Sequence, residues 1–136
     1  MMSIKEIMTD NLTTVNPNTI VTQVSKLFEQ NTFHHIPVVN DENICVGIIS
    51  KSDYFQIQDQ MTKMNQEKAD KSNQLLWRSL LAEDIMTSPI ISLDIGEELE
   101  SAVDIFLENR VHSLVITEDG KCKGIVTTFD LIKTLK

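Results

Sequence analysis

The sequence lacks any apolar run that approaches the roughly 20 residues needed for a membrane-spanning helix, and nothing in it resembles a signal peptide. It also has few basic residues, since 12 Lys and Arg stand against 20 Asp and Glu and give a formal net charge of −8 at pH 7. Nonspecific nucleic-acid binding and polybasic membrane surfaces both depend on basic residues. We therefore expect a cytoplasmic protein with neither a membrane nor a nucleic acid as partner.

Cysteines and histidines are scarce, and their spacing does not suit a metal site. Cys45 and Cys122 lie too far apart for a zinc motif. The three histidines, His34, His35 and His112, lack the i, i+4 spacing of helical zinc ligands, and adjacent side chains on a strand point to opposite faces. We expect no metal site. We also expect two reduced thiols, because cytoplasmic disulfides are rare, with a disulfide as the alternative.

The motifs of common hydrolytic enzymes are missing as well. The sequence contains neither a glycine-rich nucleophile elbow nor a Walker-type P-loop. Neither cysteine has an obvious base nearby in the sequence, and Asp53 and Asp130 do not form a nucleophile-and-base pair. We therefore expect a protein that is not an enzyme and that requires no cofactor.

The sequence consists of one unit used twice. Residues 47–53 (GIISKSD) recur as residues 124–130 (GIVTTFD), each a glycine, two aliphatic residues, a hydroxyl residue, two variable positions and an aspartate. Upstream, an offset of 78 positions carries Met8 onto Met86, and after a turn that loses one residue the offset becomes 77. Units of about 55 residues are marginal alone because they bury too little surface. The two units should therefore fuse into one module.

Each unit has the pattern of an α/β fold in the order β-α-β-β-α. A right-handed crossover should make the first two strands of each unit parallel. In the first unit we expect a lead-in at 3–8 packed on the other half, strands at 12–15, 35–39 and 45–49, a helix capped by Asn16 with Pro17 in its first turn, and a helix from Ser50. In the second we expect strands at 90–93, 113–117 and 123–126, a helix capped by Asp94 with Glu97 completing a capping box, and a helix from Thr128.

The candidate site lies at the C-terminal motif of each unit, residues 47–53 and 124–130. Ser50 with Asp53, and Thr127 with Asp130, give a capping-box-like helix start at the carboxyl end of a strand. Ligands of open α/β sheets bind at such ends, where helix N–H groups are free. A carboxylate there suits a ribose diol, and an adenine ring needs an apolar slot. The apolar residues expected to line such slots are Val15, Val24, Leu93 and Ala102.

The segment between the units differs from both. Residues 58–74 are polar and contain no Gly or Pro, which favours a helix over a flexible linker. A denser apolar cluster follows, made of Leu75, Leu76, Trp77, Leu80 and Leu81. The cluster either packs across the two halves or forms a dimer or partner surface.

Taken together, the Ile-Met-Thr opening, residues 34–39 (HHIPVV) and the Gly-aliphatic-aliphatic-Ser/Thr-x-x-Asp close resemble a tandem pair of cystathionine β-synthase (CBS) domains. The resemblance implies two repeats packed about a pseudo-twofold axis, with repeat 1 at 1–57, a helical linker at 58–80 and repeat 2 at 81–136. It also implies a sensor that binds an adenosine-containing ligand between the repeats, associates as a homodimer and modulates an unidentified partner protein. The ligand expected is AMP, ADP or ATP, with S-adenosylmethionine and NADH as alternatives. The other reading is a ligand-free interaction or dimerisation module.

The same resemblance implies that each cleft is lined by residues of both repeats. One cleft should combine Thr127 and Asp130 with Thr19, Val24, His34 and His35. The other should combine Ser50 and Asp53 with Glu97, Ala102 and His112. Because Ser113 is neutral and Glu97 is acidic, the second cleft should hold phosphates less well than the first.

Overall fold

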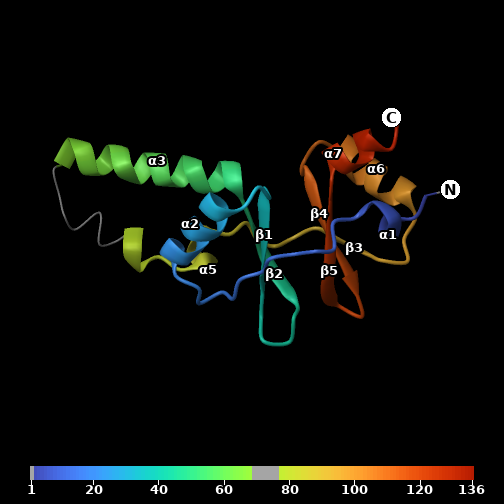
Figure 1. Ribbon diagram of the computed structural model, residues 1–136, viewed down its shortest axis with the longest axis horizontal. Helices are drawn as coiled ribbons and strands as arrows, with labels where there is room; N and C mark the ends of the chain where they lie inside the picture. The colour runs from blue at the N-terminus through green and yellow to red at the C-terminus, as the bar shows by residue number, and fades with distance from the viewer. Residues whose placement is uncertain (1, 69–76) are drawn as a thin grey trace.

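The computed structural model describes residues 2–68 and 77–136 and has two halves side by side, each with a small sheet and flanking helices (Figure 1). The expected α/β class is confirmed. The first half of the chain contains α1 (Ile4–Ile7), α2 (Val21–Gln30), β1 (His35–Val39), β2 (Cys45–Ser50) and α3 (Lys51–Lys68). The second contains α5 (Ala82–Ile85), β3 (Ser92–Asp94), α6 (Leu99–Leu107), β4 (Ser113–Glu118), β5 (Lys121–Thr127) and α7 (Thr128–Lys133).

The two sheets follow the expected strand directions. β1 and β2 form an antiparallel hairpin, as do β4 and β5, and β3 lies parallel to β4. The strand predicted at 12–15 is wrong, because only Val15 pairs there, in a single parallel bridge to Val38. The segment at Val15 thus runs parallel to β1, as β3 does to β4, but it forms no strand, and the first sheet has one strand fewer than the second.

Both predicted caps of the longer crossover helices are wrong. α2 begins at Val21 and α6 at Leu99, each several residues after the predicted start. The Oδ1 atom of Asn16 accepts a hydrogen bond from the N–H of Asn18 (3.0 Å), and the Oδ2 atom of Asp94 accepts one from the N–H of Gly96 (2.8 Å). Each side chain thus stabilises a local turn, which short polar side chains do as readily as they cap helices.

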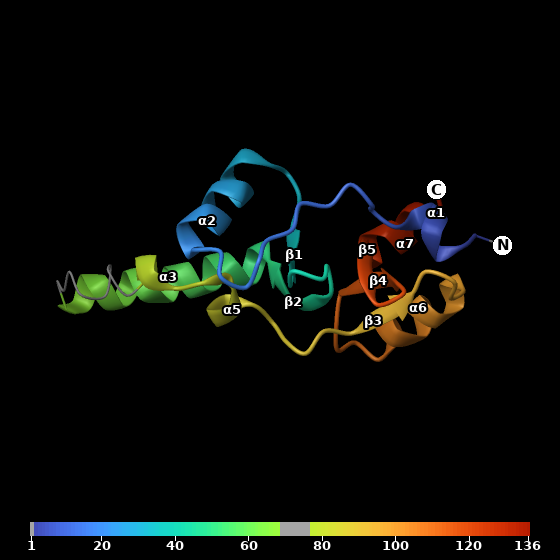
Figure 2. The ribbon, with the colours of Figure 1, turned by 90° about the horizontal axis from the view of Figure 1, so that it is seen from below.

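Each short lead-in helix packs on the opposite half. α1 lies beside the second sheet and α5 beside the first, as the two views in Figures 1 and 2 agree. Ile4 is fully buried in the second core, and Ala82 is fully buried in the first. The lead-in predicted at 3–8 is therefore confirmed, and each core is completed by a segment of the other repeat.

Two backbone bridges repeat this exchange symmetrically. Thr9 pairs with Ile125 through N–H···O bonds of 2.8 and 2.9 Å, and Thr87 pairs with Ile48 through bonds of 2.8 and 3.1 Å. Thr9 corresponds to Thr87 and Ile48 to Ile125 in the repeat. The two halves are thus related by a pseudo-twofold axis and joined into one module.

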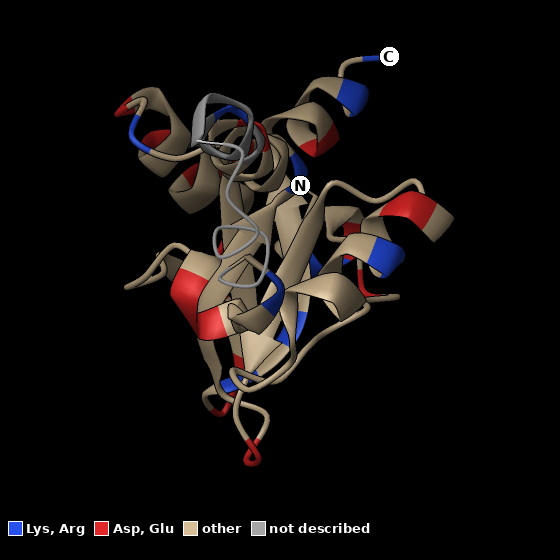
Figure 3. Ribbon diagram, turned by 90° about the vertical axis from the view of Figure 1, so that its left-hand side faces the viewer, with Lys and Arg blue, Asp and Glu red and all other residues tan. Residues whose placement is uncertain are grey.

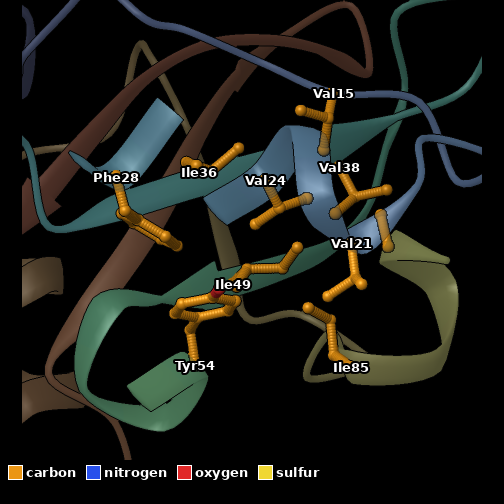
Figure 4. Packing of buried hydrophobic residues seen from close by; sticks show 10 residues of the cluster. Val15, Val21, Val24, Phe28, Ile36, Val38, Ile49, Tyr54 and Ile85 are labelled. Atoms are coloured by element: carbon orange, nitrogen blue, oxygen red, sulfur yellow. The ribbon is translucent and has the colours of Figure 1, made fainter. Parts of the chain in front are cut away.

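The linker helix and the last helix of the first repeat are one element. α3 runs without interruption from Lys51 to Lys68, so the predicted boundary between residues 57 and 58 falls inside it. Tyr54 is buried in the first core (Figure 4), and Ile57, Trp77 and Leu80 pack against that core. Leu75 and Leu76 lie outside the described residues. The described part of the apolar cluster therefore contributes to packing.

Candidate functional site

Two cavities lie between the halves, and the repeat relates one to the other. The larger, about 750 Å³, contains Asp130 and is called here the Asp130 cleft; the smaller, about 320 Å³, contains Asp53 and is called the Asp53 cleft. The Asp130 cleft is lined by residues 9, 11–13 and 32–35 of the first half together with residues of β5 and α7. The Asp53 cleft is lined by residues 87, 89–91 and 110–113 of the second half together with residues of β2 and α3.

In the Asp130 cleft the predicted capping box is complete. The Oδ2 atom of Asp130 accepts hydrogen bonds from the N–H (2.8 Å) and the hydroxyl (3.1 Å) of Thr127, and the N–H of Asp130 donates to Oγ1 of Thr127 (3.2 Å). The carboxylate is only 7% exposed, and the ammonium of Lys133 lies 3.5 Å from Oδ1. The cap therefore fixes the carboxylate at the cleft wall and leaves Oδ1 as the oxygen that it does not use.

In the Asp53 cleft the same motif is only half formed. The N–H of Asp53 donates to Oγ of Ser50 (3.1 Å), and that Oγ lies 3.5 Å from Oγ of Ser52. Within the described part of the chain no hydrogen bond engages the Asp53 carboxylate, which is exposed. The two clefts thus share residue types but differ in how firmly their aspartate is held.

His35 and His112 line both clefts and so form part of the wall between them. His35 is half-buried and begins β1 opposite Ser50. Burial, with a smaller contribution from neighbouring His34, holds the pKa of His35 below its ordinary value of 6.5, although Asp53 and Asp130 both act in the opposite direction. An anion bound in either cleft would favour the charged imidazole.

Seven of the ten predicted site residues line a cleft. His34, Thr127 and Asp130 line the Asp130 cleft, Ser50 and Asp53 line the Asp53 cleft, and His35 and His112 line both. The remaining three lie elsewhere. Val24 and Ala102 are fully buried core residues, and Thr19 lines a separate surface hollow where its Oγ1 accepts from the N–H of Asn16.

The apolar slots also differ from the prediction. Val15 belongs to the first core, and Leu93 packs against the second, so neither lines its expected slot. The apolar wall of the Asp130 cleft is instead made by Leu12, Phe33, Ile125 and Phe129. The corresponding wall of the Asp53 cleft is made by Ile48, Ile90, Ile91, Val111 and Val115. Leu12, Ile90 and Ile91 come from the segments that follow α1 and α5, Phe33 and Val111 precede β1 and β4, and the others lie in β2, β4, β5 and α7. Sequence reasoning assigned no adenine contact to any of them.

The charged residues near the clefts differ from those predicted. Glu97 is exposed, accepts a hydrogen bond from the hydroxyl of Ser101 (3.2 Å) and lines neither cleft. Sequence reasoning missed two cations, Arg110 in the Asp53 cleft and Lys133 in the Asp130 cleft. The repeat itself held the signal for Arg110, because it lies two positions before His112, a predicted site residue.

Neither a metal centre nor a membrane span is present in the residues described. No group of three or more His, Cys, Asp or Glu side chains within them could hold a metal ion. None of the helices described is long and apolar enough to cross a membrane. Charged residues of both signs are spread over the helices and turns (Figure 3).

Comparison with known proteins identifies the repeat. The sequence model of the CBS domain matches residues 4–58 and again residues 82–136. The chain is 25% identical over 132 residues to an uncharacterised protein of Methanocaldococcus jannaschii, an alignment that covers 97% of this chain and 42% of that protein. The chain therefore spans less than half the length of this curated relative.

Solved structures share the fold over nearly their whole length. CBSX2 from Arabidopsis thaliana in complex with AMP is 22% identical, with a TM-score of 0.77 over 99% of this chain and 96% of that one. The CBS domain pair of protein MJ0100, in complex with 5′-methylthioadenosine and S-adenosyl-L-methionine, is 19% identical, with a TM-score of 0.76 over the same shares. At these identities the likeness shows a common fold.

Proposed function

Because this chain belongs to the CBS domain family, with one CBS domain in each half, we propose that it is a sensor that binds an adenosine-containing ligand between its repeats and regulates a partner protein. CBS pairs are non-catalytic, and the two matched segments include most of the chain. The ligands proposed are AMP, ADP or ATP. Structures with the same fold hold AMP in one case and S-adenosyl-L-methionine in another, which supports an adenosine group as the common element.

The observation that carries the proposal is the composition of the Asp130 cleft. Its volume of about 750 Å³ is within the range typical of small-molecule sites, about 300–1,000 Å³. Its lining includes the apolar residues Leu12, Phe33 and Ile125, the buried carboxylate of Asp130 and three histidines. An adenosine nucleotide needs this combination of an apolar surface for the base, a carboxylate for the ribose and donors for the phosphate.

Within that cleft each group has a proposed role. The Oδ1 atom of Asp130 accepts hydrogen bonds from the ribose diol, because Oδ2 already accepts two from Thr127. Leu12, Phe33 and Ile125 contact the base. His34 and His35 hold the phosphate, and Lys133, whose ammonium lies 3.5 Å from Asp130, supplies a nearby positive charge.

The Asp53 cleft is the proposed second site. Ser50 and Asp53 take the ribose role there, and His112 together with Arg110 faces the phosphate. The smaller volume, about 320 Å³, and the incompletely capped aspartate favour weaker binding than in the Asp130 cleft. We propose a homodimer as the assembly through which ligand binding reaches the regulated partner.

A thermal-shift series tests the proposal. The reduced protein is melted alone and with AMP, ADP, ATP, S-adenosylmethionine or NADH, and with inosine monophosphate as a base-altered control. A ligand that binds the native state raises the melting temperature by mass action, by an amount that grows with its concentration. At least one adenosine ligand should raise it, and Asp130→Asn should reduce the rise. If none of the ligands changes the melting temperature at millimolar concentration, the ligand-free interaction module becomes the better reading.

A further inference from the structure

The two cysteines meet at the interface between the repeats. Cys45 begins β2 and Cys122 lies near the start of β5, at positions that the repeat makes equivalent. Each is 7% exposed, and with Val115 they form one buried cluster. Residues related by a pseudo-twofold axis can contact each other only where they lie close to that axis. The two cysteines therefore lie close to the pseudo-twofold axis, where the two hairpins meet.

Backbone and side-chain hydrogen bonds hold the two hairpins together around the cysteines. The N–H of Cys122 donates to the carbonyl of Asn43 (3.0 Å), and Nδ2 of Asn43 donates to the carbonyl of Cys122 (3.4 Å). The ammonium of Lys121 donates to the carbonyl of Glu42 (2.6 Å). These three contacts join the turn of the first hairpin to β5, so neighbouring structure holds the two cysteines near each other.

The thiols also affect each other chemically. A hydrogen bond with Cys122 lowers the pKa of Cys45, against the opposing effect of burial, and the same interaction with burial raises the pKa of Cys122. Cys45 is therefore the thiol that ionises first, and the thiolate is the form that attacks a disulfide. In the exchange considered below, Cys45 is taken as the attacking thiol and Cys122 as the resolving one.

We propose that Cys45 and Cys122 form a reversible disulfide between the two repeats when the protein meets a low-molecular-weight disulfide. The Cys45 thiolate attacks one sulfur of the small disulfide, forms a mixed disulfide and releases one small thiolate. The Cys122 thiol then loses its proton to solvent and attacks the Cys45 sulfur, which breaks the mixed disulfide and releases the second small thiolate. Two protein thiols are oxidised to one disulfide, and the small disulfide is reduced to two thiols.

This bond would link the ends of two strands whose opposite ends carry the clefts. β2 runs from Cys45 to Ser50, and β5 continues past Cys122 to Thr127. Neither cysteine lines either cleft. The disulfide would therefore constrain how the repeats sit against each other without occupying a ligand site. It would also close a long loop, which restricts the unfolded chain and raises the melting temperature, by ~5 °C or more.

The test uses the full chain incubated with glutathione disulfide below its melting temperature. Intact mass, peptide mapping and a thiol count after unfolding should show both thiols consumed, two hydrogen atoms lost, and a peptide that joins Cys45 to Cys122. Cys45→Ser and Cys122→Ser are the matched controls, because each can form only a mixed glutathione adduct. The wild-type melting temperature should rise on oxidation and return on reduction, and the single variants should show no such rise.

Two outcomes would overturn the proposal. One is wild-type protein that keeps both thiols after prolonged incubation, although the unfolded chain forms the internal bond under the same oxidant. The other is product consisting only of glutathione adducts or of disulfide-linked dimers. Neither readout involves a nucleotide, so the result is independent of whether the clefts bind one.

Discussion

Met86 lies directly against Gly47, so that a Cβ atom added at Gly47 would overlap the Sδ and Cγ atoms of the methionine. The repeat places Met8 in the same relationship to Gly124, where an added Cβ would stand 2.6 Å from Sδ. The methionine of each Ile-Met-Thr opening thus packs on the glycine that begins the closing motif of the other repeat. Two motifs that are distant in sequence are therefore halves of one contact between the repeats.

Gly47→Ala should destabilise the protein by about 1–3 kcal/mol, the usual cost of overpacking. Urea unfolding measures the change in free energy. Met86→Ala combined with Gly47→Ala should recover part of the loss, because the three atoms nearest the added Cβ all belong to the Met86 side chain. The matched pair at Gly124 should recover less, since the backbone carbonyl of Thr9 also lies 3.0 Å from the added atom. Purely additive effects at Gly47 and Met86 would contradict this account.

Asp130→Asn should lower nucleotide affinity at least tenfold, because hydrogen bonds to charged groups contribute about 1.5–3 kcal/mol. The measurement is calorimetric titration with the nucleotide that gives the largest thermal shift. Asp53→Asn is the matched variant at the equivalent position and should affect the weaker site. Since Asp130 also caps α7, the melting temperature of the unliganded variant must be followed in parallel. A folded variant with unchanged affinity would exclude the ribose role of Asp130.

Features that depend on local residues could be predicted from the sequence in part, whereas features set by tertiary packing could not. Thr127 and Asp130 could be predicted as a capping pair because a cap is local. Asn16 and Asp94 carry an equally good local signal, yet they stabilise turns, and the helices begin several residues later. Local patterns alone do not separate a helix cap from a turn, because the same short polar side chains serve in both.

The residues that line the clefts could not be predicted without knowing that each repeat contributes a segment to the other half. Val24 and Ala102 were predicted to contact the adenine, but their helices present these residues to the cores, where they are fully buried. The lead-ins that cross to the other half bring Leu12 and Ile90 to the cleft walls instead. The sequence contained no direct signal for that placement, because it depends on contacts between residues of different repeats, such as Thr9 with Ile125 and Ile48 with Thr87.

The two clefts should bind phosphate-bearing ligands unequally. His34→Ala should weaken binding in the Asp130 cleft, and Arg110→Ala should weaken it in the Asp53 cleft, each by removing a donor to phosphate. Glu97→Thr should leave both affinities unchanged, because Glu97 lines neither cleft. Calorimetry should resolve two classes of site, or one site per chain. Two identical, independent sites per chain would refute the inequality.

A homodimer should be detectable at tens of micromolar, an order-of-magnitude choice for moderate affinity. Phe129, Ile132 and Leu135 follow one another at a spacing of three along α7 and its end, and are 64%, 62% and 86% exposed. Such a stripe typically marks an association surface. Sedimentation should show a dimer that Ile132→Glu converts to a monomer, whereas Ile44→Ser, a change at an exposed turn, should not. A monomer at all accessible concentrations would contradict the prediction.

The unliganded protein should lose stability as the pH falls below about 6.5, because His35 binds a proton less readily in the native than in the unfolded chain. Burial and His34 lower its native pKa, while Asp53 and Asp130 raise it, and His112, Arg110 and Lys133 line the same clefts. Between the unfolded value of 6.5 and the lower native value, the unfolded chain binds more protons, so the free energy of unfolding increases with pH in that window. Above it, this contribution is constant.

His35→Gln should therefore reduce the pH dependence of the melting temperature between pH 7.5 and the acid end of the native range, in buffers of matched ionic strength. His112→Gln, which also removes a histidine shared by both clefts, is the control. A phosphate-bearing ligand should have the opposite effect on His35, because a nearby anion favours the charged imidazole. Nucleotide affinity should thus rise as the pH falls towards and just below 6.5 in the wild type, and more weakly in His35→Gln. Equal pH profiles for the wild type and His35→Gln, with and without nucleotide, would show that His35 does not couple proton binding to the clefts.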